Sequence, residues 1–255
     1  MLKIHHFRNA TFVIEMDTAI ILVDPMLGPK GIMPPFTFFR AKARKNPTVS
    51  LPESCNEILQ KVTHCLITHR HPDHLDTTAI RFFTAPSLPV PCSSPAEQIL
   101  TPHGLQIANT LSYKKKTSFL GGSIEGIPAK HGYGFVAKPM GNVMGFYIEL
   151  PNPPSIYISS DTIYTDAVDE VLKQYKPEIT VVAAGSAQFD LFRPVLMTLD
   201  DILTFIRNSP GEVIANHLEA INHCPTTRKD LRATLEKHGL SEKVYIPEDG
   251  EVLKL

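Results

Sequence analysis

Thr68-His69-Arg70-His71-Pro72-Asp73-His74 is the stretch that decides how this sequence is interpreted. It follows the apolar run Cys65-Leu66-Ile67, which is typical of a buried strand, and it precedes a helical apolar pattern over 75–84. Four side chains that can bind a metal therefore stand just beyond the end of a predicted strand. In an α/β sheet this edge is where ligands usually bind.

The spacing of this motif suits a metal site. His69 and His71 are two residues apart, so an extended backbone points both imidazoles to the same side. Pro72 then turns the chain toward the helix, which brings Asp73 and His74 beside them. Imidazole and carboxylate ligands suit zinc, manganese and iron. One short segment can thus contribute to two metal ions, but it cannot complete both coordination spheres.

Three further residues are candidates for the missing ligands. His131, Asp161 and His217 each stand just beyond the end of a predicted strand, as the motif residues do. Taken singly, they also fit a loop histidine, a helix cap and a buried core histidine. His223 competes with His217, but it lies six residues beyond the end of its strand, so we favour His217.

Strand and helix patterns alternate along most of the chain. We expect strands at 2–7, 10–15, 19–24, 63–68, 178–184 and 212–216, and helices at 75–84, 166–175, 198–207 and 227–238. A strand pair is expected over 143–150 and 156–160, and a last pair within 244–255, around the turn Asp249-Gly250. This order predicts a layered α/β architecture. No linker is evident, so we expect a single domain over 1–255.

The segment 26–52 interrupts this alternation with many Pro and Gly residues. We interpret it as a lid-like insertion, because long loops in compact domains tend to be lids or binding loops. Phe36, Phe38 and Phe39 could roof an apolar pocket, pack in the core or form a subunit contact.

Composition limits the classes of protein. The chain has 255 residues, 25 Lys and Arg against 26 Asp and Glu, and 43 % hydrophobic residues, which excludes a disordered protein. The net charge of −1 makes a nucleic acid an improbable partner. No apolar run could span a membrane and no secretory signal is evident, so we expect a cytoplasmic protein without a membrane partner. The scattered Cys55, Cys65, Cys92 and Cys224 fit reduced core residues. Oligomeric state is left open, with a homo-oligomer as one alternative.

The chain resembles the metallo-β-lactamase superfamily of metal-dependent hydrolases. The similarity includes 10–15, 21–25, the motif at 68–74, His131, 160–162 and His217, and it is greatest for the branch that contains L-ascorbate 6-phosphate lactonase. The sequence departs from that branch at Arg8-Asn9 and at Ser160. The resemblance implies a four-layer αββα sandwich. It also implies two divalent ions, zinc before manganese or iron. One would be bound by His69, His71 and His131, the other by Asp73, His74 and His217. Asp161 would bridge them and Asp24 would orient ligands.

The expected activity is hydrolysis of a small-molecule ester, lactone or related bond by a hydroxide held between the two ions. Asp73 or Asp161 would pass a proton to the leaving group. One alternative is a phosphodiesterase or nuclease, supported by the basic residues Arg40, Lys42, Arg44 and Lys45 and the run at 114–116. The other is a non-hydrolytic metal-binding or redox protein.

Overall fold

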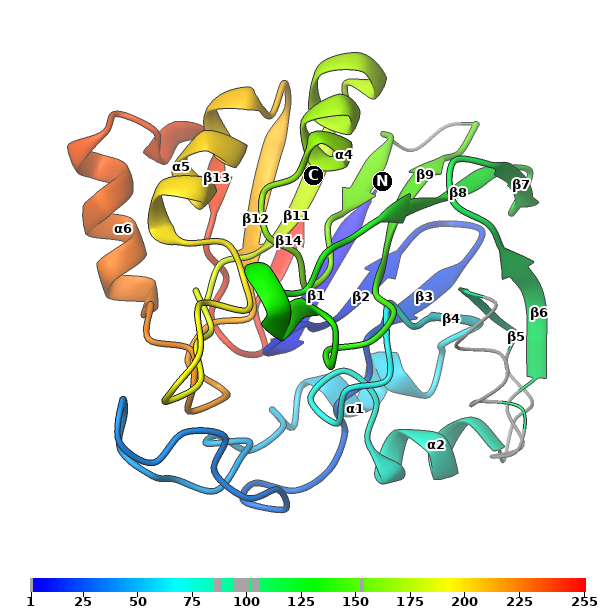
Figure 1. The fold of residues 1–255 in the computed structure, drawn as a ribbon. Helices are drawn as coiled ribbons and strands as arrows, with labels where there is room; N and C mark the ends of the chain where they lie inside the picture. The colour runs from blue at the N-terminus through cyan, green and yellow to red at the C-terminus, as the bar shows by residue number, and fades with distance from the viewer. Residues whose placement is uncertain (1, 85–88, 94–100, 102–105, 152–153) are drawn as a thin grey trace.

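The computed structural model describes residues 2–84, 89–93, 101, 106–151 and 154–255, and within them two sheets face each other (Figure 1). The first sheet has the order β14-β1-β2-β3-β4. Its strands are β1 (Lys3–Arg8), β2 (Thr11–Glu15), β3 (Ile20–Val23), β4 (His64–Leu66) and β14 (Val252–Lys254). β3 and β4 run parallel, whereas the other neighbours are antiparallel.

The second sheet has the order β13-β12-β11-β10-β9-β8-β7. Its strands are β7 (Lys116–Phe119), β8 (Gly122–Pro128), β9 (Met144–Glu149), β10 (Ile156–Ile158), β11 (Ile179–Ala183), β12 (Glu212–Asn216) and β13 (Val244–Tyr245). β9 runs antiparallel to both β8 and β10, and β10 to β13 run parallel. The carboxyl ends of β8, β10, β11 and β12 therefore meet at one edge. A separate parallel pair joins β5 (Pro89–Ser93) and β6 (Gln106–Leu111).

Helices cover the outer face of each sheet, which completes four layers (Figure 1). α1 (Cys55–Leu59) and α2 (Thr77–Thr84) lie on the first sheet. On the second lie α4 (Asp166–Glu170), the continuing π-helical turn η3 (Val171–Tyr175), α5 (Leu199–Asn208) and α6 (Arg228–Lys237). Short 3-10 turns are η2 (Gly134–Ala137) and η4 (Ser241–Lys243). The expected αββα sandwich is confirmed.

Side-chain alternation explains why the sheets pack in this way. In β2, Phe12 and Ile14 point into the core between the sheets, whereas Val13 packs under α1 and α2. The inner core joins these residues to Phe146 and Ile158 of the second sheet. Because every central strand is covered on both faces, the runs are almost wholly apolar, as predicted for 19–24.

One expectation about the C-terminus is wrong. The strands within 244–255 do not pair with each other: β13 lies beside β12, whereas β14 lies beside β1 in the other sheet. The Asp249-Gly250 turn does not close a hairpin, because the Gly250 N–H donates to the carbonyl groups of His6 and Phe7 instead. The chain therefore crosses between the sheets at this point.

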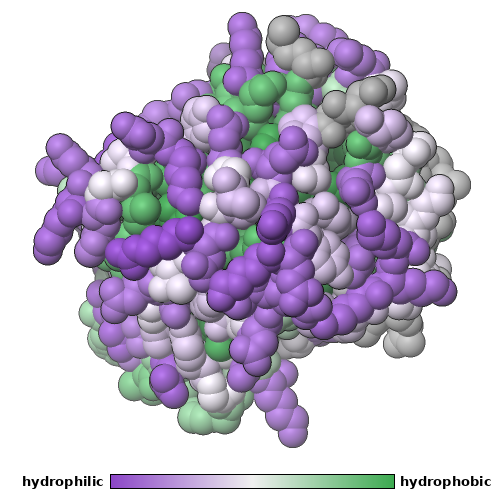
Figure 2. All heavy atoms as spheres, turned by 90° about the horizontal axis from the view of Figure 1, so that it is seen from above, coloured by the Kyte–Doolittle hydropathy of each residue, from purple (hydrophilic) through white to green (hydrophobic). Residues whose placement is uncertain are grey.

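The segment 26–52 contains neither helix nor strand and lies at the bottom of Figure 1. The opposite end, seen in Figure 2, presents mostly hydrophilic side chains. Among the described residues, no helix combines the length and apolar character needed to cross a bilayer.

Candidate metal centre

The sequence motif forms a tight turn between β4 and α2, where the two sheets meet. The N–H groups of His74 and Leu75 both donate to the His71 carbonyl, 2.8 Å away, which brings the four motif side chains to one side. The Met144 N–H donates to the Thr68 carbonyl at 3.1 Å and fastens this turn to the second sheet.

The other three candidates come from the second sheet. His131 follows β8, Asp161 follows β10 and His217 follows β12, so the parallel strand ends bring them to the same edge. Ser160 and His217 adopt φ of 60° and 58°. A left-handed backbone conformation is uncommon for residues other than glycine. Here it turns the chain at His217 itself and at the residue before Asp161.

Asp161 lies at the centre of the cluster. Its Oδ2 atom is 3.3 Å from Nε2 of His74, 3.4 Å from Nε2 of His131, 3.7 Å from Nε2 of His217 and 3.9 Å from Nε2 of His69. The structure thus brings all the predicted ligands together. The ligands form three overlapping groups, and within each group the ligand atoms all lie within 4.8 Å of one another. These groups are His69, His71 and His131; His69, His74 and Asp161; and Asp73, His74 and His217.

These residues fit divalent cations. The Nε2 atoms of His69, His74 and His217 are buried and lack a hydrogen-bond partner, as does Oδ1 of Asp161. Buried polar atoms are nearly always paired, so several orphans facing one point indicate a missing partner. Five imidazoles and two carboxylates within reach of one another form a ligand set suited to zinc, manganese or iron.

The electrostatics of the cluster agree with this fit. Burial favours the neutral imidazole and lowers the pKa of His131 to about 4. His74 is buried too, but the Asp161 and Asp24 carboxylates outweigh burial and raise the pKa of His74 to about 10. Despite the opposing effect of burial, His74 and His217 hold the pKa of Asp161 well below its usual range. Protons on His74 and His217 thus supply positive charge beside the carboxylates, whereas burial lowers the pKa of His69, His71 and His131.

Asp24 occupies the position expected of a residue that orients ligands. Its Oδ2 accepts from Nδ1 of His74 at 2.9 Å and from the Thr68 hydroxyl at 2.7 Å, and its Oδ1 accepts from the Thr68 N–H. The Thr68 hydroxyl in turn lies 3.0 Å from Nδ1 of His69. Because Nδ1 of each ring is occupied, Nε2 faces the centre of the cluster.

Two positioning contacts were missed in the sequence. Nδ1 of His131 lies 2.7 Å from the Val195 carbonyl, and a main-chain partner leaves no side-chain signal. Asn9 donates to the Asp73 carbonyl at 3.0 Å and accepts from the His217 N–H at 2.8 Å, so it ties together the two sheets. Because the Asn9 side chain also contacts a main-chain carbonyl, this role too leaves no side-chain signal in the sequence.

His223 belongs to none of the ligand groups found among the described residues. It lies between two aromatic rings, with centroids 5.3 Å from Phe36 and 5.2 Å from Phe189. Phe36 thus packs against a histidine outside the ligand groups. Phe38 and Phe39 are 57 % and 91 % exposed, which excludes the core alternative for both.

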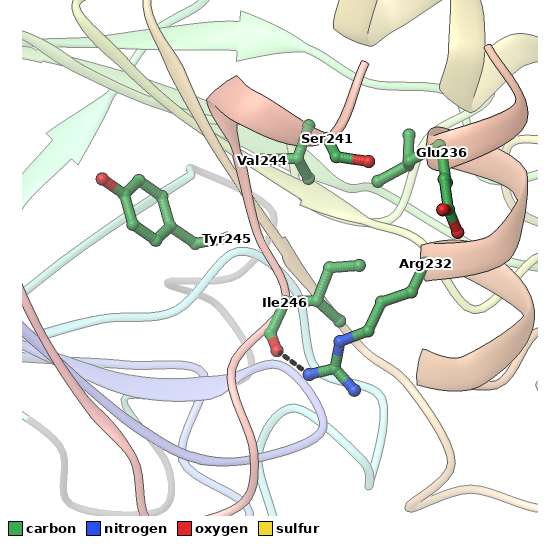
Figure 3. Close-up of a pocket in the computed structure, with 7 residues that line it drawn as sticks. Arg232, Glu236, Ser241, Val244, Tyr245 and Ile246 are labelled. Carbon is green, nitrogen blue, oxygen red and sulfur yellow. Dashed lines mark hydrogen bonds between the residues drawn. The ribbon is translucent and has the colours of Figure 1, made fainter. Parts of the chain in front are cut away.

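A hollow lies beside α6 and β13, and its lining includes none of the candidate metal ligands (Figure 3). Its polar side chains include Arg232, Glu236 and Ser241, and Arg232 donates to the Ile246 carbonyl at 2.8 Å. A molecule bound in this hollow would therefore not touch the histidine and aspartate cluster through the residues that line it.

Known proteins are similar to this chain in sequence and in fold. A sequence profile described as "Beta-lactamase superfamily domain" matches residues 20–217. The "UPF0173 protein YddR" of Bacillus subtilis (strain 168) is 30 % identical over 259 aligned residues, covering 98 % of each chain. The chain therefore belongs to the metallo-β-lactamase superfamily and, within it, to the UPF0173 family of metal-dependent hydrolases.

Two solved structures are similar over almost their full length. A possible metal-dependent hydrolase from Veillonella parvula DSM 2008 has a TM-score of 0.91 at 29 % identity, covering 100 % of both chains. An isothiocyanate hydrolase from Delia radicum gut bacteria has a TM-score of 0.90 at 29 % identity, covering 99 % of both chains. They support a metal-dependent hydrolase of this superfamily.

Proposed function

We propose that this protein holds two divalent ions, most favourably zinc, and hydrolyses a small molecule at an electrophilic carbon. The observation that carries the proposal is the central Oδ2 of Asp161, within 3.3 to 3.9 Å of four imidazole nitrogens. One ion would be held by His69, His71 and His131, and the other by Asp73, His74 and His217. Asp161 would contact both.

Ions bound there would supply Lewis acidity and lower the pKa of water to about 7. The chain's own residues orient the site and handle protons. Asp24 and the Val195 carbonyl fix the rings of His74 and His131 by occupying Nδ1. Asp161 is surrounded by imidazoles, so we assign the transfer of a proton to the leaving group to the Asp73 carboxylate.

The proposed substrates have an electrophilic carbon that activated water can attack. Esters and lactones match the expected chemistry, and the lactonase-like branch remains part of this proposal. The isothiocyanate hydrolase relative adds a second kind of electrophilic carbon, one that is doubly bonded to nitrogen and sulfur. Both classes need attack by activated water at carbon, so they make the same demand on the cluster.

The nuclease alternative receives little support from the surface. Lys114 pairs with Glu170 at 2.6 Å, and Lys116 pairs with Glu149 at 2.7 Å. Arg40 donates to the carbonyl groups of Phe189 and Asp190. Three of the seven basic residues that suggested this alternative therefore have partners within the protein. A steep decrease of substrate affinity with salt would favour it nonetheless.

The test combines metal analysis with a screen of hydrolysis. We expect two ions per chain, and turnover of at least one lactone, ester, thioester or isothiocyanate. The double variant His69→Ala/His71→Ala should lose more than about 100-fold of that activity, since even loss of a ligand's hydrogen-bond partner costs about 10–100-fold. His238→Gln, at an exposed histidine, is the control. A double variant with full activity contradicts the proposal.

A further inference from the structure

Four of the five imidazoles of the cluster share a pattern in which Nδ1 meets a partner on the side away from the centre. For His69, His74 and His131 the partner is an oxygen atom, at 2.7 to 3.0 Å. For His217 it is sulfur: Sγ of Cys224 lies 3.4 Å from Nδ1. Sulfur is larger than oxygen, so this separation is within hydrogen-bond range for a thiol.

The chain is built to allow this approach. After β12 the chain reverses at His217 and Glu219, both with positive φ, and it returns to Cys224 through a turn in which the Cys224 N–H donates to the Ile221 carbonyl. A side chain at Gly185 would come within 2.2 Å of the His217 carbonyl and within 2.9 Å of the Cys224 sulfur. Glycine at 185 is what lets the thiol reach the ring.

We propose that Cys224 is a positioning residue for His217, an inference that rests on the proposed function. Nδ1–H of His217 donates to Sγ, which fixes the rotation of the ring. Nε2 then points toward Oδ2 of Asp73, 3.4 Å away, and toward Oδ2 of Asp161. That Nε2 atom is buried and lacks a hydrogen-bond partner, so it remains available to a metal ion.

A purely space-filling cysteine would differ from this one. Cys55 is also buried, yet it packs among apolar residues of α1 and the first sheet. Cys224 is buried beside Met26, Val195 and Ile221, but its sulfur faces two imidazoles, since Nδ1 of His223 lies 3.9 Å away on another side. The polar contacts distinguish a positioning role from packing alone.

The test is zinc titration of the metal-free full-length protein, followed by calorimetry, for the wild type and three variants. Cys224→Ala should weaken one of the two binding steps by about 10–100-fold and leave the other nearly unchanged. Cys224→Ser retains an acceptor and should recover most of that loss. Cys55→Ala removes another buried thiol and should leave both steps unchanged. Equal weakening of both steps, or none, in Cys224→Ala overturns the inference.

A second measurement separates this inference from the proposed function. NMR should show a slowly exchanging Nδ1–H proton of His217, identified by its loss in His217→Gln, in the protein without metal. This resonance should disappear or exchange rapidly in Cys224→Ala and persist in Cys55→Ala. A wild type that binds no zinc refutes the proposed function, whereas a Nδ1–H signal unaffected by Cys224→Ala refutes the contact.

Discussion

At the scale of single residues, the centre depends on side chains that touch no substrate. Asp24 is the clearest case, because one carboxylate accepts hydrogen bonds from the Thr68 N–H, the Thr68 hydroxyl and the His74 ring. Its backbone also has φ of 44°, a conformation that Asn tolerates about as well as Asp. An amide at this position would therefore preserve the fold and remove the charge.

Asp24→Asn should reduce hydrolysis and metal affinity by about 10–100-fold, the usual effect of losing a partner that orients a ligand. Metal content after dialysis and the rate with the best substrate of the screen measure both effects. Asp17→Asn, at an exposed aspartate in the turn between β2 and β3, should change neither. If Asp24→Asn retains both ions and full rate, Asp24 has no orienting role.

His6 makes stability depend on pH at a point outside the metal centre. Burial lowers its pKa below the usual 6.5, against the opposing influence of Asp249. The unfolded chain therefore binds a proton at His6 before the folded chain does. The contribution of neutral His6 to the free energy of unfolding is complete above pH 6.5. It is lost as the pH falls from there toward the pKa of His6 in the folded state.

We expect the free energy of unfolding, measured in urea with a chelator present, to fall as the pH is lowered from 7 to 5. In His6→Gln the slope should be smaller by up to about 1.36 kcal/mol per pH unit, the value for one proton. His5→Gln, one residue away, serves as the control. Identical slopes in wild type and His6→Gln would exclude His6 as a source.

At the scale of elements, the segment 26–52 is fastened by side chains rather than by helix or strand. Asn222 accepts from the Phe36 N–H at 2.8 Å, and it donates to the carbonyl groups of Thr37 and Lys42. Asp190 accepts from the successive N–H groups of residues 38 to 40. Arg8 donates to the carbonyl groups of Met26, Gly28 and Val49, near both ends of the segment.

Asn222→Ala should loosen this segment, since buried polar groups left without partners cost about 1–3 kcal/mol each. The exposed Arg40, Lys42 and Arg44 offer trypsin sites, so cleavage there should become faster. KM should change while metal content stays the same, because Asn222 touches no ligand. The exposed Asn56→Ala is the control. Unchanged proteolysis and kinetics would show that Asn222 does not hold the segment.

The elements also show how far the sequence could lead. Apolar runs bounded by turn residues predicted the central strands and the covering helices, because burial on both faces leaves a strong local pattern. The Asp249-Gly250 turn led to a wrong prediction of a strand pair. The two strands beside it pair instead with strands that are distant in the sequence. For the site, the ligands could be proposed from strand ends, but Asn9 and Cys224 act through contacts that depend on tertiary packing alone.

At the scale of the whole molecule, bound ions should stabilise the folded chain. An ion at 100 times its dissociation constant adds about 2.7 kcal/mol if only the folded state binds it. For a protein of this size, each kcal/mol raises the Tm by about 2–4 °C. Zinc should therefore raise the Tm by several degrees, and a chelator should reverse the shift. Scanning calorimetry measures this, with His69→Ala/His71→Ala as the control. A Tm indifferent to zinc would contradict binding by the folded state.

The candidate ligands are divided between the two sheets: the motif residues follow β4, whereas His131, Asp161 and His217 follow strands of the other sheet. Neither half alone can complete a coordination sphere. Ions bound there would link the two sheets, so that separation of the sheets at this site and release of the cations would occur together. Metal deprivation would then loosen the junction of the sheets at this end, whereas the apolar core between them would still hold the fold together.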